Sequence, residues 1–439
     1  MLIGRRKFLL SAGVATVAFT GRKSWSQGAV PVGAPPYGFP VVQLHTDDTS
    51  AQFRLLVNPL RPTIYEATTI DGTPLPLAVL SSTVNPFVRT EALDHVLVEG
   101  LQSGRDYLLK AYDEKTGAQV EERIFRALDT RPRVARFVVA SCMMDVLEAF
   151  QDAMFDAVQK SKPEVIFFIG DTTYTDIGGG NNVADNWRRH IESRRIFNFG
   201  KWKRLVPIYA TWDDHDFGGN NMDGTLSRKV ESLKAFKAMW GWTPRGTALT
   251  GHGVSSHVEL CGQRFYLMDD RFFRDSAATS SGNQWGPSQE NWLMTSISSS
   301  ATPTWIMNGG QFFGGYLGKE SFEYDHPQEL ARITQTLREL EAPAVLVSGD
   351  VHFSELMTIE KAQLGYETFE VTSSSLLSTT NPIQDTKKVN PRRLTSTWHH
   401  NFVVIDSDPR KPGGLDFRVR SIGRGLKVYF DKTCSVRRV

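Results

Sequence analysis

A single stretch of the sequence, Thr211-Trp212-Asp213-Asp214-His215-Asp216-Phe217-Gly218-Gly219-Asn220-Asn221, sets the interpretation of the whole chain. It holds three carboxylates, an imidazole and two amides, and an apolar core accepts no such group without partners. The residues directly before it, 203–210, are mostly apolar and predict a short buried strand. The polar stretch therefore begins where a strand ends, which is where α/β proteins place their chemistry.

The alternative interpretation of this stretch is a solvated, glycine-rich turn. A turn seldom needs four consecutive side chains that can bind a metal or transfer a proton. Asp, His and Asn at the end of a strand supply hard oxygen donors and an imidazole, which are ligands of divalent and trivalent metals. We therefore expect a metal site at this strand end.

Other apolar segments end in polar residues in the same way. The strands predicted besides 203–210 cover residues 134–140, 165–170, 264–268, 304–307 and 344–349. Helices are predicted over residues 146–160 and 327–340. Six strands that deliver polar residues at one end favour an α/β domain with a functional site at that end, which we place at residues 133–439.

The beginning of the chain predicts an export signal. Residues 1–29 follow a basic, apolar, polar order, and the adjacent Arg5 and Arg6 resemble the twin-arginine type of signal. The alternative is a lone surface helix. We expect the twin-arginine translocase as a partner and a periplasmic or secreted location.

Short alternating segments with turn signals between them cover residues 35–130 and predict an all-β domain. Within it, Leu101-Gln102-Ser103-Gly104-Arg105-Asp106-Tyr107 resembles a corner of fibronectin type III sandwiches, in which a tyrosine packs beneath the turn. No cluster of metal-binding residues falls in this domain, so we expect it to pack against the site and restrict access.

Composition excludes several classes of protein. The formal charge is +2, and removing the five basic residues of the first 26 leaves about −3, so we expect no nucleic-acid-binding surface. Three cysteines cannot form a disulfide framework without leaving one thiol unpaired. No stretch reaches the roughly 18 consecutive apolar residues of a membrane span. We expect a monomer.

The polar residues at the strand ends could together hold two or three cations. The carboxylates and the imidazole are those of Asp171, Asp214, Asp350 and His352, and Cys142 and Tyr174 stand nearby in the sequence. Two close metals can bind a phosphoryl group and generate hydroxide for its hydrolysis. Arg271 and Arg274 could hold phosphate oxygens through bidentate hydrogen bonds; the alternative for Arg271 is a salt bridge to one of the local aspartates.

Competing catalytic schemes fit less well. The chain has no G-x-S-x-G elbow. Residues 313–320 differ from a phosphate-binding P-loop at Phe313 and Glu320. Cys142 as a covalent nucleophile stays open, although neighbouring carboxylates oppose thiolate formation unless a cation is present.

These motifs resemble the alkaline phosphatase D (PhoD-like) phosphodiesterases of the calcineurin-like metallophosphoesterases. The stretches that carry the resemblance are Ala140-Ser141-Cys142, Gly170-Asp171-Thr172-Thr173-Tyr174, Trp212-Asp213-Asp214-His215-Asp216, Asp269-Asp270-Arg271-Phe272-Phe273-Arg274, Gly286-Pro287-Ser288-Gln289-Glu290-Asn291-Trp292-Leu293 and Ser348-Gly349-Asp350-Val351-His352. The resemblance implies a four-layer α/β/β/α sandwich behind the fibronectin-like domain.

The resemblance also implies roles for single residues. Asp171 would bridge two cations, and Tyr174 and Cys142 would bind iron. Asp214 takes the place of an asparagine in the G-N-H-[ED] motif of the superfamily. The remaining implied assignments are His215 as the catalytic histidine, Asp350 and His352 as the equivalents of the paired histidines of G-H-x-H, and Gln311 at the position of a histidine ligand.

An aspartate in place of a histidine favours harder cations, so the expected cofactors are Fe3+ and Ca2+, with other divalent metals as alternatives. Asn220 is a further candidate for substrate binding. We expect an exported phosphodiesterase or alkaline phosphatase that hydrolyses phosphate mono- or diesters through metal-bound hydroxide. The rivals are a relative restricted to a nucleotide, phospholipid or teichoic-acid-type substrate, and an extracellular binding protein with a structural metal site.

Overall fold

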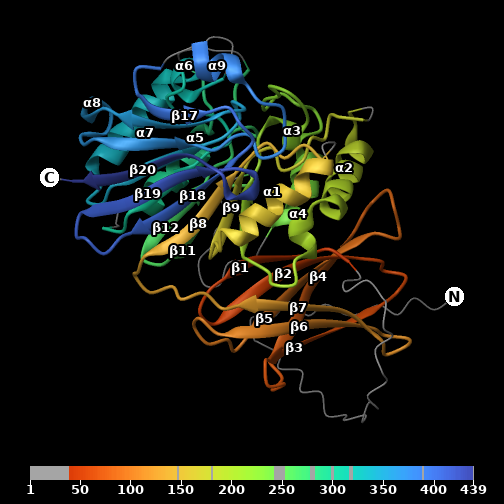
Figure 1. Ribbon diagram of the computed structural model, residues 1–439. Coiled ribbons are helices and arrows are strands. Elements are labelled where there is room, and N and C mark those ends of the chain that lie inside the picture. Colours follow the sequence, from red (N-terminus) through yellow and green to blue (C-terminus); the bar gives the residue numbers. More distant parts are fainter. Residues whose placement is uncertain are drawn as a thin grey trace. The chain divides into compact units, whose positions relative to one another are not determined.

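The computed structural model describes residues 39–145, 148–178, 181–241, 253–276, 282–297, 301–315, 320–387 and 390–438. The predicted export signal, residues 1–29, lies outside these ranges, as do residues 35–38 and the first two residues of the helix predicted over 146–160. The described chain has a mixed α/β fold in which strands predominate, which confirms the predicted fold class at this level (Figure 1).

Seven antiparallel strands form two sheets in the amino-terminal part of the described chain, in the orders β1-β2-β5-β4 and β3-β6-β7. The strands are β1 (Val41–Thr46), β2 (Ser50–Val57), β3 (Thr63–Thr69), β4 (Leu77–Val84), β5 (Ala92–Glu99), β6 (Asp106–Asp113) and β7 (Gln119–Arg126). They share one apolar core. The hydroxyl of Tyr107 accepts a hydrogen bond from the N–H of Gln102 (2.6 Å), at the corner singled out in the sequence.

A six-stranded sheet follows, with the order β10-β9-β8-β18-β19-β20. The strands are β8 (Ala135–Ala140), β9 (Val165–Ile169), β10 (Ile208–Thr211), β18 (Phe402–Asp408), β19 (Gly414–Ile422) and β20 (Val428–Arg437). Strands β8, β9 and β10 are parallel, so their carboxyl ends meet at one edge. The hydroxyl of Tyr209 in β10 accepts a hydrogen bond from the N–H of Thr46 in β1 (3.2 Å), which joins this sheet to the amino-terminal strands.

The second large sheet has seven strands in the order β11-β12-β13-β14-β16-β15-β17. They are β11 (Ser256–Leu260), β12 (Gln263–Leu267), β13 (Thr304–Met307), β14 (Ala344–Ser348), β15 (Ser354–Ile359), β16 (Thr368–Thr372) and β17 (Arg393–Thr397). Strands β12, β13, β14 and β16 are parallel. Their carboxyl ends therefore also share one edge.

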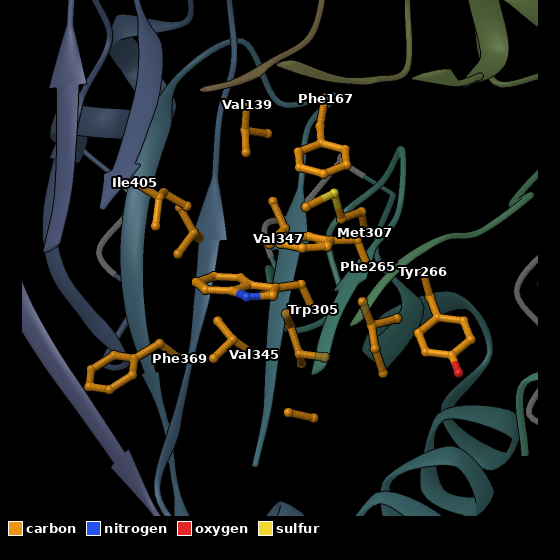
Figure 2. Packing of buried hydrophobic residues seen from close by; sticks show 14 of the residues in the cluster. Val139, Phe167, Phe265, Tyr266, Trp305, Met307, Val345, Val347, Phe369 and Ile405 are labelled. Carbon is orange, nitrogen blue, oxygen red and sulfur yellow. The ribbon is translucent and has the colours of Figure 1, made fainter. Parts of the chain in front are cut away.

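Side chains of both large sheets fill a common core, part of which is seen in Figure 2. Along β8, Phe137 and Val139 belong to this core, whereas Val138 and Ala140 belong to the apolar cluster on the opposite face. This alternation is the period-two pattern of a strand that is buried on both faces. Trp305 of β13 is fully buried within the core, and its indole N–H donates to Gln263 (2.8 Å).

Helices cover the outer sides of the sheets (Figure 1). Apolar residues of α1 (Glu148–Lys160), α2 (Val183–Ile196) and α4 (Lys229–Trp240) pack in the cluster of the six-stranded sheet. Those of α5 (Gly286–Ile297) and α7 (Pro327–Glu339) pack in the cluster that contains the seven-stranded sheet. The short helices are α3 (Asp214–Phe217), α6 (Phe322–Asp325), α8 (Lys361–Leu364), α9 (Pro382–Lys387), η1 (Asn198–Lys201) and η2 (Arg424–Leu426). None of the helices in the described ranges is long and apolar enough to cross a bilayer.

Two local predictions around the opening stretch are corrected. The strand predicted over residues 203–210 is only Ile208–Thr211, because Pro207 has no N–H to donate and Leu205 packs into the core of the amino-terminal sheets. The loop predicted after it starts with the helix α3. The carboxylate of Asp213 caps this helix by accepting from the N–H of Asp214 (2.9 Å), and Asp216 completes the capping box.

Candidate functional site

The predicted site residues follow strand ends in both large sheets. Cys142 follows β8, Asp171 follows β9, Asp214 begins α3 directly after β10, and His352 follows β14. Cys142, Asp171 and Asp214 are buried, and His352 is half-buried. The loops at these ends therefore enclose the polar side chains that the sequence singles out.

The backbone at this site is strained. Cys142, Asp171, Asp350 and His352 have φ values of 56°, 51°, 64° and 62°, in the left-handed region that non-glycine residues rarely adopt. Each such residue costs about 1–2 kcal/mol, and strain of this kind is retained chiefly at functional sites. Five other non-glycine residues of the described ranges, among them Lys162 and Cys261, also have positive φ, so the strain indicates a functional site only together with the side-chain chemistry found here.

A first group of metal-binding side chains consists of Cys142, Asp171 and His352, whose ligand atoms all lie within 4.8 Å of one another. The hydroxyl of Tyr174 lies 3.2 Å from Oδ2 of Asp171 and 3.3 Å from Nε2 of His352. Thiol, phenol, carboxylate and imidazole therefore converge at one point. Of the three cysteines, all free and buried, Cys142 is the one in such a group among the described residues.

A second group consists of Asp171, Asp214 and His215, again with ligand atoms within 4.8 Å. Asp171 belongs to both groups, so one carboxylate lies between two potential cation positions. The short helix α3 carries Asp214 and His215, and the N–H of Asn221 donates to Oδ2 of Asp214 (2.6 Å). These contacts fix the direction of the Asp214 carboxylate.

His215 is held by a carboxylate that the sequence analysis did not assign. Its Nδ1 lies 2.8 Å from Oδ1 of Asp176, and its ring packs on Tyr174 with centroids 4.1 Å apart. Burial acts to lower the pKa of His215, but Asp171, Asp176 and Asp214 outweigh it and raise the pKa to about 10. With no cation bound, this imidazole therefore carries a proton at neutral pH.

The electrostatics of the two groups fit bound cations. The pKa of Asp171 is raised, mainly by burial and next by the neighbouring Asp214. The pKa values of Cys142 and Tyr174 are also raised, mainly by burial and next by Asp171. Burial also acts to raise the pKa of Asp214, but Arg271, His215 and the Asn221 N–H hold it below its usual value. Crowded, buried acids gain their charged forms when a cation lies between them. The first group brings a thiol, a phenol, a carboxylate and an imidazole together, whereas the second offers carboxylates and an imidazole, so the two groups would suit cations of different kinds.

Two further predicted ligands are Asp350 and Gln311. Asp350 is half-buried and is a member of neither group, but its carbonyl oxygen lies 3.8 Å from the sulfur of Cys142 and its charge acts to raise the pKa of that thiol. The side-chain nitrogen of Gln311 donates to Glu355 (2.8 Å) and Thr372 (3.0 Å). Its side-chain oxygen, the atom that would bind a cation, is buried without a hydrogen-bond partner among the described residues.

The predicted phosphate-binding arginines are engaged in ion pairs. Arg271 is 0% exposed, with Nε 2.5 Å from Asp213 and Nη1 2.8 Å from Glu320. Arg274 is buried and pairs with Glu320 and Asp325, each at 2.9 Å. Nη2 of Arg271 lies 2.5 Å from Asp213 but forms no hydrogen bond within the described residues, so the ion pairs do not use every donor of the guanidinium. Asn220, the other predicted substrate contact, is exposed.

Sequence analysis also missed the segment after β16, Ser373-Ser374-Ser375-Leu376-Leu377-Ser378-Thr379-Thr380-Asn381. Its hydroxyl and N–H groups contact Cys142, Tyr174 and His352. The one signal in the sequence is its density of hydroxyl residues, which is also typical of surface loops.

Comparisons with known proteins agree with this description. Residues 137–418 match the sequence model of the PhoD-like phosphatase family. The solved structure described as "Structure of PhoD" superposes with a TM-score of 0.70 at 16% identity, covering 93% of this chain and 91% of that one, so the two share a fold. Astrotactin-2 (13% identity, 31% and 28% covered) and a cyclomaltodextrinase (10%, 71% and 60%) match with TM-scores of only 0.18 and 0.19. No curated protein matches the sequence.

The family match spans more than half of the chain and defines its class, a phosphoester hydrolase. The chain belongs to the PhoD-like phosphatase family, as the resemblance of its motifs predicts.

Proposed function

We propose that this protein is a metal-dependent phosphoester hydrolase in which Asp171 bridges two cations. The single observation that carries the proposal is the membership of Asp171 in both groups of ligand atoms. Cys142, Tyr174 and His352 would complete the first cation site, and Asp214 the second. Bound cations would neutralise phosphoryl oxygens and lower the pKa of a water molecule.

His215 would act as the proton donor to the leaving oxygen. Support comes from the contact of its Nδ1 with Asp176 (2.8 Å), which fixes the ring, and from its place beside Asp171 and Asp214. Asp176 would then be a positioning residue, because a carboxylate on Nδ1 directs Nε2 away from itself. Asn220 remains a candidate contact for the substrate.

We propose Fe3+ for the first position and Ca2+ for the second, on the basis of their donors. A ferric ion bound by a phenolate or thiolate gives a visible charge-transfer colour, whereas Ca2+ or Zn2+ gives none. Elemental analysis and an absorption spectrum of the purified protein test this assignment, together with Tyr174→Phe, which should shift or bleach the band while the protein stays folded. A colourless, iron-free wild type with full activity would refute the iron assignment and leave the hydrolase proposal standing.

The hydrolase proposal has its own test. Purified protein is offered aryl phosphate monoesters and bis-aryl phosphate diesters, before and after treatment with a chelator. We expect hydrolysis that chelation abolishes and added cations restore, and the two substrates report the preference for mono- or diesters. Activity that survives complete metal removal would overturn the proposal.

We also propose the finer assignments of fold and location. The large sheets and their helices would constitute the four-layer α/β/β/α sandwich over residues 133–439. The preceding strands, with the Tyr107 corner, would form a fibronectin type III-like domain over residues 35–130. Export by the twin-arginine route would require Arg5 and Arg6, so Arg5→Lys with Arg6→Lys should retain the protein in the cytoplasm on fractionation.

A further inference from the structure

The segment after β16, which we call the serine segment (residues 373–381), is bonded to the strained loops that carry the first group. The N–H groups of Leu377 and Ser378 both donate to the carbonyl oxygen of Cys142, at 3.0 and 2.9 Å. The N–H of Asn381 donates to the carbonyl oxygen of His352 (2.8 Å). One short segment therefore holds the backbone of two of the three ligands of this group.

The hydroxyls of the same segment reach the ligand side chains themselves. Oγ of Ser374 lies 3.1 Å from the sulfur of Cys142, and Oγ of Ser378 lies 2.9 Å from the hydroxyl of Tyr174. Thr379 Oγ1 lies 2.9 Å from Nδ1 of His352, which leaves Nε2 as the nitrogen that faces Tyr174. Both serines are fully buried, so no bulk water competes for these contacts.

The two hydroxyls around Cys142 differ in whether they have a hydrogen available for its sulfur. Ser141 Oγ lies 3.2 Å from the sulfur, but Ser141 donates its hydrogen to the carbonyl oxygen of Ser373 (2.8 Å) and can only accept from a thiol. Ser374 Oγ accepts from the N–H of His352 (2.9 Å), which leaves its own hydrogen for the sulfur. Ser374 is therefore the hydroxyl that can stabilise a thiolate, the form that binds metals.

Ser378 Oγ lies 2.9 Å from the hydroxyl of Tyr174 and 3.5 Å from Nε2 of His352, and the single hydrogen of that phenol can go to Asp171 or to Ser378. A phenolate that binds a cation can only accept, and a serine hydroxyl can turn its hydrogen toward it by rotation. We propose that Ser374 and Ser378 are positioning residues of the metal centre, which donate hydrogen bonds to the Cys142 thiolate and the Tyr174 phenolate and so set how firmly this position holds a trivalent cation. The inference rests on the proposed metal-dependent function.

The test compares Ser374→Ala and Ser378→Ala with a matched control from the same segment. Ser373→Ala removes an equally buried hydroxyl, which donates to the carbonyl oxygen of Val139 (2.7 Å) and, within the described part of the chain, contacts no side chain of the first group. The probes are ferric citrate and CaCl2, titrated into metal-free protein with a competing chelator. The second readout is the position of the charge-transfer band.

We expect Ser374→Ala and Ser378→Ala to weaken ferric binding by about 10- to 100-fold and to move the band, because they remove hydrogen bonds to metal ligands. Calcium affinity should stay within about twofold of wild type, and Ser373→Ala should match wild type in both readouts. Ser374→Thr and Ser378→Thr, which keep a hydroxyl, should restore part of the affinity.

The outcomes distinguish this inference from the proposed function. Wild-type ferric affinity and an unmoved band in both alanine variants would overturn the positioning role, as would an equal loss in Ser373→Ala, which would make the segment a scaffold only. A wild type that binds no ferric ion yet hydrolyses phosphate esters would overturn the role together with the iron assignment. Ferric binding with the expected variant effects but no ester hydrolysis would support the role and refute the proposed function.

Discussion

Replacing Arg271 with methionine tests whether this residue holds phosphate or holds the protein together. The side chain is 0% exposed and pairs with Asp213 and Glu320, which are 1% and 18% exposed. Removing one partner of a buried ion pair costs about 3–5 kcal/mol, because the other charge remains buried without compensation. Arg271→Met keeps most of the side-chain volume, so the loss of the pairs dominates the effect.

We therefore expect Arg271→Met to lower the free energy of unfolding by about 3–5 kcal/mol in urea denaturation followed by circular dichroism. The matched control is Arg332→Met. Arg332 also forms a bidentate pair, with Glu290 at 3.1 and 3.0 Å, but half of its side chain is exposed, and such pairs contribute less than about 1 kcal/mol.

The pair with Asp213 also links Arg271 to catalysis, because Asp213 caps the helix that presents Asp214 and His215. We expect the variant to lose bound metal along with stability. A variant with wild-type stability and metal content but a raised KM would refute this reasoning and restore Arg271 to the phosphate-binding role that the sequence suggests.

Three further predictions concern the site and its support. Asp214→Ala should bind one cation fewer, as measured by elemental analysis, and its kcat/KM should be lower by about 100-fold or more. Full metal content with normal turnover would contradict the second cation position. Gly170→Ala should destabilise the protein by about 1–3 kcal/mol and reduce bound metal, because Gly170 has a φ of +101° and the added Cβ would lie 2.6 Å from Cβ of Asp213. A melting curve like that of the wild type would disprove this prediction. The pKa of His190 is lowered to about 3, mainly by burial and further by Arg194 and Arg189. Below pH 6.5 the unfolded chain therefore binds a proton at this residue, whereas the folded chain does not. The free energy of unfolding of the wild type should thus fall by about 3 kcal/mol between pH 6.5 and 4, and that of His190→Leu should not show this fall. Parallel pH dependences of the two unfolding free energies would rule this out.

Much of the site follows from the sequence because strands and metal ligands have local signatures. Apolar runs ending in Cys142, Asp171 and Asp214 indicate strand ends, and the parallel order of β8, β9 and β10 brings these ends together. Their residue types then suffice to suggest cations. The mixed α/β class is also confirmed, since it depends on the same alternation of strands and helices.

The parts that sequence analysis missed depend on partners far away in the chain. The sequence leaves Arg271 open between a phosphate ligand and an ion-pair partner of a nearby aspartate, and only the fold reveals its pairing with Glu320, 49 residues later. The serine segment follows β16, whose alternating Thr368-Phe369-Glu370-Val371-Thr372 is too short and polar to predict a buried strand, although all five residues are buried. Asp176 lies within the predicted polar loop, but only the fold brings it to His215.

The depth of the first group bears on when a cation could enter it. Cys142 is 0% exposed, and Asp171 and Tyr174 are each 1% exposed, so their donor atoms are enclosed by the folded chain. Burying a carboxylate, a thiol and a phenol together is costly unless a cation offsets their charge, and binding to the folded state alone stabilises that state. Metal uptake is therefore expected to be slower into folded, metal-free protein than during folding. The twin-arginine route predicted from the paired arginines carries folded proteins, so it would suit a chain that takes up its cation before export.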